Sequence, residues 1–379
     1  MSSRPLTTAL LLPPSPHTSI ASTLTFWTAP LTSALARPLT LPTLLYIGVP
    51  APFPTTPRRT TFAPAQRLLT GLYSLVYRLT PRPASAVPFD VRIVLLSPED
   101  EAEASFGPVM STDQLADLQE WDVLLVPRGE AGYQLQGAFL AATGSPGVHV
   151  YYVDAGVRAP AGEVDAELAG AAGEGEEHAV VAVGGTFDHL HLGHKLLLTM
   201  TAYLLTSPSA APATNPRLIV GLTGPAMLRN KKHAEFMESW EERSTRSLEF
   251  LRGVVDVTPF ESRAAEGTGR GEGGDGDEKK LLSEVPEFRE EGKGAGASEE
   301  RRNLHIEIVS ISDPFGPTIT DPTVTALVVT QETASGGAAV NAKRTEAVWP
   351  ELEVAVVDLL IAHDGEKLSS TELRRQKAV

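Results

Sequence analysis

The chain reads Gly184-Gly-Thr-Phe-Asp-His-Leu-His-Leu-Gly-His194 where an apolar run, 179–183, gives way to a helix-like run, 195–205. A buried strand, a glycine turn and the start of a helix therefore follow one another. Helix N-termini present unpaired N–H groups and a partial positive charge, so they bind phosphates, and glycine lets the backbone approach a phosphate closely. His191 and His194 are three residues apart and can share one face of the first helical turn. The stretch thus predicts a phosphate site that includes two histidines.

A second motif follows much later and reads Lys367-Leu-Ser-Ser-Thr-Glu-Leu-Arg374. Ser369 or Ser370 is a natural N-cap, and Glu372 can complete a capping box with Ser369. Taken alone, this pattern indicates a plain capped helix. A hydroxyl-rich helix start that carries two cations is also typical of a phosphate site. Together with the first motif, the phosphate site is the better interpretation.

Strand-like and helix-like runs alternate along the chain, which predicts an α/β fold. From residue 179 onward the alternation predicts a doubly wound parallel sheet with right-handed crossovers. Ligands of such sheets bind beyond the carboxyl ends of the strands, where the first motif would lie. A smaller N-terminal α/β domain, 1–154, shows no recognisable chemistry. The expected strands are 8–12, 43–49, 91–96, 121–126, 179–184, 217–223, 254–258, 304–310, 326–331 and 352–358, and the expected helices are 16–36, 64–79, 192–206, 239–252, 338–348 and 369–377.

Two stretches of biased composition divide the chain further. Residues 155–178 are rich in Ala, Gly and Glu, which predicts a linker. Residues 262–303 are rich in Gly, Glu and Lys and nearly free of aromatic residues, so they cannot bury enough surface to fold. We therefore expect a disordered insertion at 262–303 within the domain 179–379.

Composition excludes several kinds of protein and of site. The 379 residues are 42% hydrophobic and 21% charged, as in ordinary globular chains. No cysteine is present, which excludes disulfides, zinc–thiolate sites and cysteine nucleophiles. The net charge of −15 argues against a nucleic-acid partner, and no apolar run approaches the roughly 18 residues of a membrane span. We expect a cytoplasmic protein, with association with mitochondria as the alternative because no acidic residue precedes Asp90.

The paired motifs, a glycine turn into His-x-Gly-His and a later Ser-Ser-Thr-x-x-Arg, resemble those of the nucleotidyltransferase superfamily. The segments between them narrow the resemblance to the eukaryotic type of phosphopantetheine adenylyltransferase. These segments include Ser312-Asp-Pro-Phe-Gly-Pro317, Gln331-Glu-Thr-Ala-Ser-Gly-Gly337 and Trp240-Glu-Glu-Arg243. The resemblance covers 179–379 and implies a Rossmann-like nucleotidyltransferase fold there. The preceding part loosely resembles the amino-terminal region of bifunctional coenzyme A synthase, but the chain lacks the Gly-x-x-x-x-Gly-Lys-Ser/Thr loop of a second, kinase activity.

The resemblance implies transfer of the adenylyl group of ATP to 4′-phosphopantetheine, giving dephospho-coenzyme A and pyrophosphate, with Mg²⁺ accompanying ATP. The acceptor phosphate is already ionised, so positioning and charge stabilisation would drive the reaction rather than a strong base. Other enzymes of coenzyme A biosynthesis are candidate partners. Two alternatives stay open: adenylyl or cytidylyl transfer to another phosphate acceptor such as nicotinate mononucleotide, and a catalytically silent scaffold.

The resemblance also implies roles for individual residues. His191 and His194 are expected to donate to the phosphates of ATP, and Lys231 or Lys232 to bridge the reacting phosphates. One departure is Ser335, which stands where the resemblance leads us to expect a basic residue. The implied substrate-binding residues are Gly185, Thr186, Phe187 and Arg243, and the implied ATP-binding residues are Gly184, Gly193, Glu332, Asn341, Arg344, Ser369, Ser370, Thr371 and Arg374.

Several of these side chains also have simpler interpretations. Four residues of the first motif could form a zinc cluster, but adjacent positions at a helix start diverge and the glycines would stay unexplained, so we expect no resident metal. We expect His189 to be a surface or packing residue and Lys195 to face solvent. Arg243 and Arg246 can equally be charges on a helix surface. The four potential zinc ligands are Asp188, His189, His191 and His194.

Overall fold

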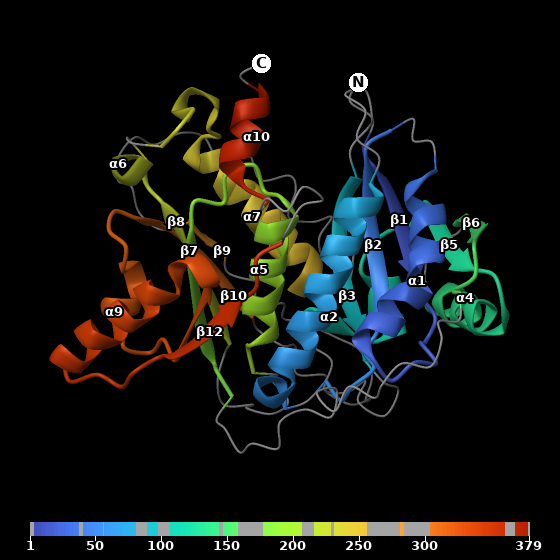
Figure 1. Cartoon of the computed structure of the whole chain (residues 1–379), viewed down its shortest axis with the longest axis horizontal. Coiled ribbons are helices and arrows are strands. Elements are labelled where there is room, and N and C mark those ends of the chain that lie inside the picture. Colours follow the sequence, from blue (N-terminus) through green and yellow to red (C-terminus); the bar gives the residue numbers. More distant parts are fainter. Residues whose placement is uncertain are drawn as a thin grey trace, which may run out of the picture.

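The structure is a computed structural model of the chain, in which two α/β units lie side by side (Figure 1). Among the described residues, no helix combines the length and the apolar character needed to cross a membrane. The described residues are 4–37, 41–55, 57–80, 89–97, 107–143, 147–157, 177–206, 216–228, 231–255, 281–283, 304–360 and 368–377.

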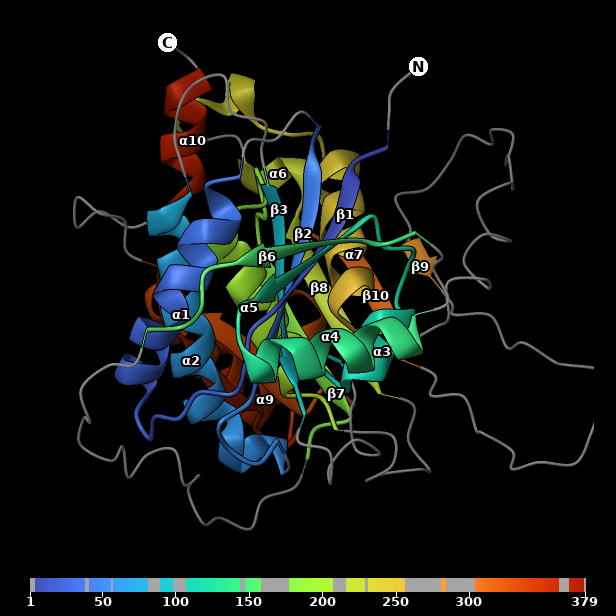
Figure 2. The same cartoon turned by 90° about the vertical axis from the view of Figure 1, so that its right-hand side faces the viewer.

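The first sheet has six parallel strands in the order β4-β3-β2-β1-β5-β6. The chain winds away from β1 in both directions, so this sheet is doubly wound. Its inner strands are almost entirely buried, as is usual for parallel strands covered on both faces. Figure 2 turns this unit toward the viewer and shows α3 and α4 side by side. The elements are β1 (Leu6–Leu11), α1 (Ile20–Leu35), β2 (Thr43–Pro50), α2 (Arg58–Leu79), β3 (Phe89–Leu96), β4 (Val109–Met110), α3 (Thr112–Asp117), β5 (Val123–Pro127), α4 (Glu130–Ala142) and β6 (His149–Val153).

The second sheet has the order β12-β11-β7-β8-β10-β9, and β9 pairs antiparallel with β10. β7 pairs with β8 on one side and β11 on the other, so the winding direction reverses between β7 and β11. Ligands of doubly wound sheets bind at the carboxyl ends of the strands at this reversal, and the glycine turn after β7 lies there. The elements are β7 (Val180–Gly185), α5 (Leu192–Tyr203), β8 (Arg217–Thr223), α6 (Pro225–Leu228), the 3₁₀ turn η3 (Ala234–Phe236), α7 (Trp240–Val255), β9 (Leu281–Ser283), β10 (His305–Ile311), the turn η4 (Gly316–Ile319), β11 (Ala326–Thr330), the turn η5 (Gln331–Thr333), α9 (Ala334–Glu346), β12 (Glu353–Val357) and α10 (Ser370–Lys377).

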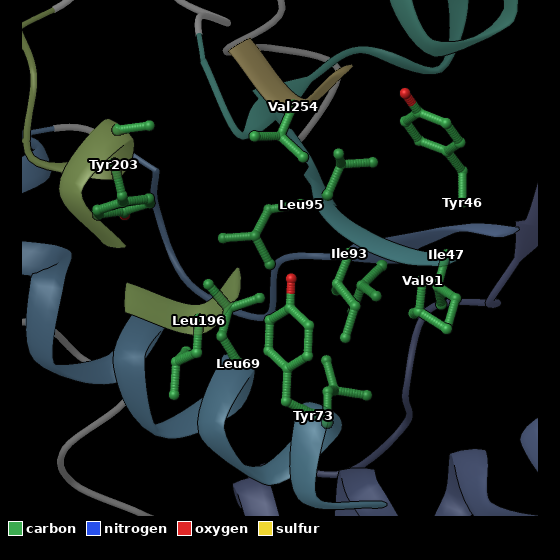
Figure 3. Packing of buried hydrophobic residues seen from close by; sticks show 14 of the residues in the cluster. Tyr46, Ile47, Leu69, Tyr73, Val91, Ile93, Leu95, Leu196, Tyr203 and Val254 are labelled. Carbon is green, nitrogen blue, oxygen red and sulfur yellow. The ribbon is translucent and has the colours of Figure 1, made fainter. Parts of the chain in front are cut away.

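The two units share one hydrophobic core. Helices α2, α5 and α7 lie between the sheets, where α5 packs on α2 and α7 packs on β3 (Figure 1). Tyr73 of α2, Ile93 of β3 and Leu196 of α5 belong to the same buried cluster (Figure 3). Burying a large apolar side chain typically contributes about 1.5–3 kcal/mol. The interface is therefore built like a protein interior and holds the first unit firmly against α5.

The doubly wound parallel α/β fold expected from the sequence is confirmed. The strand expected at 254–258 is wrong in its described part, because its first two residues form the buried last turn of α7. A short β-branched run cannot be distinguished from a buried helix end by periodicity. Helix α9 begins at Ala334, earlier than expected, and includes Gly337. A glycine is needed at this position, because a Cβ there would lie 2.7 Å from the Val354 side chain. Among the described residues, each sheet has six strands.

The domain boundaries stay predictions. Residues 158–176, which make up most of the expected linker, lie outside the described residues, as does most of the insertion expected at 262–303. Within the expected insertion, Leu281–Ser283 form β9 and pair antiparallel with β10.

Candidate active site

The loop between β7 and α5 has an uncommon backbone conformation. Phe187 and His189 have φ values of 49° and 48°, in a region that residues other than glycine rarely adopt. Such conformations persist where the surroundings fix them, and they cluster at functional sites. Arg243 of α7 fixes this loop: its buried guanidinium donates to the carbonyl oxygens of Thr186 (2.7 Å) and Thr223 (3.1 Å). The loop is therefore pre-organised by a neighbouring helix.

Helix α5 starts directly after this loop with the two histidines of the first motif. His191 is the N-cap, and its Nδ1 accepts a hydrogen bond from the backbone N–H of His194 (3.4 Å). The two rings are stacked, with centroids 3.8 Å apart and planes inclined by 16°. Nδ1 of His194 is buried and has no hydrogen-bond partner among the described residues. Buried polar atoms rarely stay unpaired, so the stacked rings retain a hydrogen-bonding atom that no described residue uses.

Burial keeps both histidines neutral at pH 7. It lowers the pKa of His191 to about 4, although the Asp188 carboxylate acts in the opposite direction. Burial also lowers the pKa of His194 well below its usual value, and the neighbouring His191 adds to this effect. A neutral imidazole still offers one N–H donor. The pair can therefore donate to a phosphate oxygen without a fixed positive charge.

Helix α10 brings the second motif against the first. Oγ of Ser370 donates to the carbonyl oxygen of Asp188 (2.9 Å) and lies 3.5 Å from Nε2 of His191, 179 positions away along the chain. The Arg374 guanidinium forms an ion pair with the Asp188 carboxylate, and both side chains are buried. Asp188 therefore binds the start of α10 through its carbonyl group and the following turn through its carboxylate, which joins the two motifs in one site.

Comparisons with known proteins test the resemblance predicted from the two motifs. Residues 1–159 match a family described as "Domain of unknown function (DUF8446)". A protein named phosphopantetheine adenylyltransferase from Saccharomyces cerevisiae is 32% identical over 200 residues, which cover 52% of this chain and 48% of that protein. One of the same name from Methanopyrus kandleri is 29% identical over 194 residues, 51% of this chain and 87% of that protein. The resemblance predicted from the two motifs is confirmed.

Other similar proteins add little about function. An uncharacterized protein of Schizosaccharomyces pombe is 30% identical over 207 residues, which cover 52% of this chain and 48% of that protein. This chain thus spans about half the length of the two fungal relatives. A solved structure of a protein of unknown function from Archaeoglobus fulgidus covers 48% of this chain and 99% of its own at 20% identity, with a TM-score of 0.26, which is too low to support a common fold.

The glycine turn at the end of β7 borders open space at Gly184. A Cβ on Gly184 would meet nothing within 4 Å, whereas one on Gly193 would lie 3.2 Å from the His191 ring. Lys231 and Lys232 are exposed, and the carbonyl oxygen of Lys232 accepts from Nε of the second-motif arginine (3.0 Å). Both lysines therefore lie next to the joined motifs with their ammonium groups in solvent.

Three residues expected to bind substrate or ATP are engaged in contacts within the protein. Arg243 holds the loop described above through its guanidinium group. Arg344 is buried and donates to backbone carbonyl oxygens, including that of Thr318 (2.8 Å). The amide of Asn341 makes two hydrogen bonds of 2.9 Å with the backbone of Leu352. These contacts support the neighbouring backbone, and the expected binding roles of the three residues stay predictions.

In the second motif the arginine makes internal contacts, and the predicted helix cap is present. Arg374 contacts Asp188 and Oγ1 of Thr371 (3.1 Å), so it ties α10 in place, and its expected contact with ATP stays a prediction. Ser369 caps the helix, because its Oγ accepts from the N–H of Glu372 (3.3 Å). Glu332 in η5, which is expected to bind ATP, is exposed on the far side of the winding reversal. Ser335 in α9, which stands where a basic residue was expected, is also exposed.

Two buried acidic residues organise the site but are not among the expected binding residues. The carboxylate of Asp188 accepts from the N–H of Glu238 (2.9 Å), and the carboxylate of Glu238 accepts from the N–H of His189 (2.8 Å). For Asp188, the available sequence signal was an acid inside a glycine-rich turn. Lys195 is also buried and does not face solvent as expected. A lone lysine in an otherwise apolar helical run was the signal for it.

A metal site on the protein is not favoured by these contacts. Among the described residues, one group of potential ligands has its atoms within 4.8 Å of one another: Asp188, His189 and Glu238. Asp188 is already paired with Arg374, and Glu238 with Arg246. The set also includes an imidazole, whereas Mg²⁺ prefers oxygen ligands. His191 and His194, the other two residues of the zinc alternative, do not belong to this group.

We predict that acidification destabilises the protein between about pH 6.5 and about pH 4. In the unfolded chain His191 takes up a proton near its ordinary pKa of 6.5, but in the folded protein only near pH 4. The unfolded state binds more protons in this window, so the free energy of unfolding falls as the pH falls. Urea denaturation at successive pH values measures this slope. His191→Asn keeps an N-cap without titrating and should show a shallower slope, and equal slopes would contradict the prediction.

Proposed function

We propose that this chain transfers the adenylyl group of ATP to 4′-phosphopantetheine, forming dephospho-coenzyme A and pyrophosphate. The observation that carries the proposal is the contact of Ser370 with Asp188 and His191, which unites the two motifs at the carboxyl end of β7. A triphosphate needs donors from several directions, and two helix starts meeting at one point offer them. The names of the yeast and archaeal relatives support the choice of acceptor.

The reaction makes few demands on proton transfer. An ionised oxygen of the acceptor phosphate attacks the α-phosphorus of ATP, and the bond from that phosphorus to the pyrophosphate leaving group breaks. Thr186 holds the acceptor phosphate through its hydroxyl, which lies 3.0 Å from that of Thr223. The neutral rings of His191 and His194 and the free N–H groups of the first turn of α5 donate to the ATP phosphates.

Positive charge comes from outside the histidine pair. Lys231 and Lys232 are exposed beside the joined motifs, and either can reach toward the phosphates as negative charge develops on the leaving group. Mg²⁺ supplies further charge compensation, and we propose that it enters on the phosphates of ATP, because the potential protein ligands are already paired.

A panel assay tests the proposal. ATP or CTP is combined with 4′-phosphopantetheine, with nicotinate mononucleotide, or with no acceptor, and pyrophosphate release is followed. We expect release with ATP and 4′-phosphopantetheine, at least about tenfold faster than with the other pairs. Preference for another acceptor or for CTP would transfer the assignment to that reaction. No release with any pair would favour a silent scaffold.

A further inference from the structure

One face of α5 carries a line of polar side chains that points at the first unit. Lys195, Thr199 and Tyr203 are four residues apart and therefore share a helix face. His191, the N-cap, is the preceding position of the same line. All three helix residues are buried within a largely apolar interface. Buried polar groups at such regular spacing need partners, and the first unit provides them.

The contact nearest the active site involves Lys195. Its Nζ binds the carboxylate of Asp90 at the start of β3 and donates to the carbonyl oxygen of Val91 (3.0 Å). It also lies 5.6 Å from the centre of the Phe250 ring of α7. Asp90 itself is half-exposed at the rim of a cavity of about 540 Å³ between the two units. A buried ammonium group that lacks its carboxylate strongly destabilises the folded protein. The Lys195–Asp90 pair therefore fixes the first turn of α5 relative to β3.

The other two contacts lie farther along the helix. Oγ1 of Thr199 is 3.4 Å from the hydroxyl of Tyr73. The hydroxyl of Tyr203 is 2.8 Å from Oγ1 of Thr61. Both involve neutral groups of α2 and lie one and two helical turns beyond Lys195. They stabilise the interface but are remote from the stacked rings.

We propose that Lys195 is a positioning residue through which Asp90 of the N-terminal unit holds the histidines of the active site in their reactive orientation. The inference rests on the proposed adenylyl transfer. Lys195 directly follows His194, and its backbone N–H donates to the carbonyl oxygen of His191 (3.0 Å). Any movement of this residue therefore moves both histidines. A displacement of about 1 Å can cost about a hundredfold in rate.

Positioning of the Lys195 side chain by Asp90 gives a function to the N-terminal unit, whose sequence shows no recognisable chemistry of its own. The charged contact is made at the first turn of α5, where the phosphate donors lie, and neutral contacts are made farther away. A charge pair whose ammonium group is buried has a stricter geometry than apolar packing, because that ammonium group must keep its carboxylate. The first unit therefore acts as a support for the catalytic helix.

The test uses the full chain and four variants. Lys195→Met keeps an unbranched side chain and removes the charge, and Asp90→Asn removes the charge from the partner. The double variant of these two measures their coupling. Thr199→Val is the matched control, because it removes a hydrogen bond on the same helix face one turn away. Urea denaturation of each variant reports the loss of stability separately from activity.

Two readouts separate positioning from mere stability. Lys195→Met and Asp90→Asn should each lower kcat at least about tenfold, with KM for ATP changed less than about threefold, and the double variant should be no worse than Lys195→Met. Thr199→Val should keep kcat within about twofold while losing some stability. In NMR spectra of the ligand-free protein, the ring proton signals of His191 and His194 should move in the Lys195 and Asp90 variants only, because stacked rings shift each other's signals.

Unchanged kcat and unchanged histidine signals in both charge variants would overturn the inference and leave the pair as interface stabilisation. Equal effects in Thr199→Val would also overturn it. If the wild-type chain releases no pyrophosphate with any substrate pair, the proposed function fails. The NMR comparison still decides whether Asp90 and Lys195 orient the histidines.

Discussion

His194→Ala lowers kcat for adenylyl transfer by at least about a hundredfold, the scale of losing one oriented donor in the transition state. The ring lies at the start of α5, stacked on His191, with its Nδ1 unpaired among the described residues. No described partner depends on that atom for its own hydrogen bond. The fold should therefore persist, and circular dichroism together with urea denaturation will check this.

The control for this variant is Thr199→Val, which lies in the same helix away from the phosphates. It should retain near wild-type turnover, so that a general effect of altering α5 is distinguished from loss of the donor. If His194→Ala turned over at nearly the wild-type rate, the ring could not be a transition-state donor, and the mechanism proposed for this site would be wrong.

Arg374→Ala is expected to destabilise the protein by about 3–5 kcal/mol and to weaken ATP binding. The change leaves the Asp188 carboxylate buried without its partner, which is the costly way to break a buried ion pair. It also frees α10, so Ser370 leaves its place beside His191. Urea denaturation and calorimetric titration with ATP and with 4′-phosphopantetheine measure the two effects.

A neighbouring arginine provides the control. Arg375 forms an exposed ion pair with Glu372 on the same helix (2.7 Å), and exposed pairs contribute only about 0–1 kcal/mol. Arg375→Ala should therefore change neither stability nor ATP affinity appreciably. Equal behaviour of the two alanine variants would mean that the buried pair does not tie α10 to the site. Weakened stability with unchanged ATP affinity would instead remove the second motif from ATP binding.

The arrangement of the second sheet was predictable because its information is local. Apolar runs gave the strands, and the alternation with helices gave a parallel sheet with right-handed crossovers. The glycine turn before His191 also identified the ligand end of β7. Local information is insufficient at the end of α7, where Val254 and Val255 continue the helix and are buried in the shared core.

Side-chain partners were much harder to predict. Nothing in a sequence says whether an arginine donates to a phosphate or to backbone carbonyl groups, and Arg243 and Arg344 do the latter. The same uncertainty applies to Arg374, which pairs with an acid 186 positions away. The sequence predicted that Lys195 faces solvent, and this prediction is wrong. Its partner Asp90 belongs to the first unit, and no local sequence pattern shows that this unit packs against α5.

The central claim is that the adenylyl group of ATP passes to the phosphate of 4′-phosphopantetheine. The most direct measurement follows ATP labelled at the α-phosphorus with the full chain, Mg²⁺ and 4′-phosphopantetheine, and identifies the labelled product by chromatography and mass spectrometry. The label should appear in dephospho-coenzyme A, with unlabelled pyrophosphate formed in equal amount, and His194→Ala should slow the formation of both at least about a hundredfold. Label remaining in ATP, or appearing in AMP or ADP without dephospho-coenzyme A, would contradict the account.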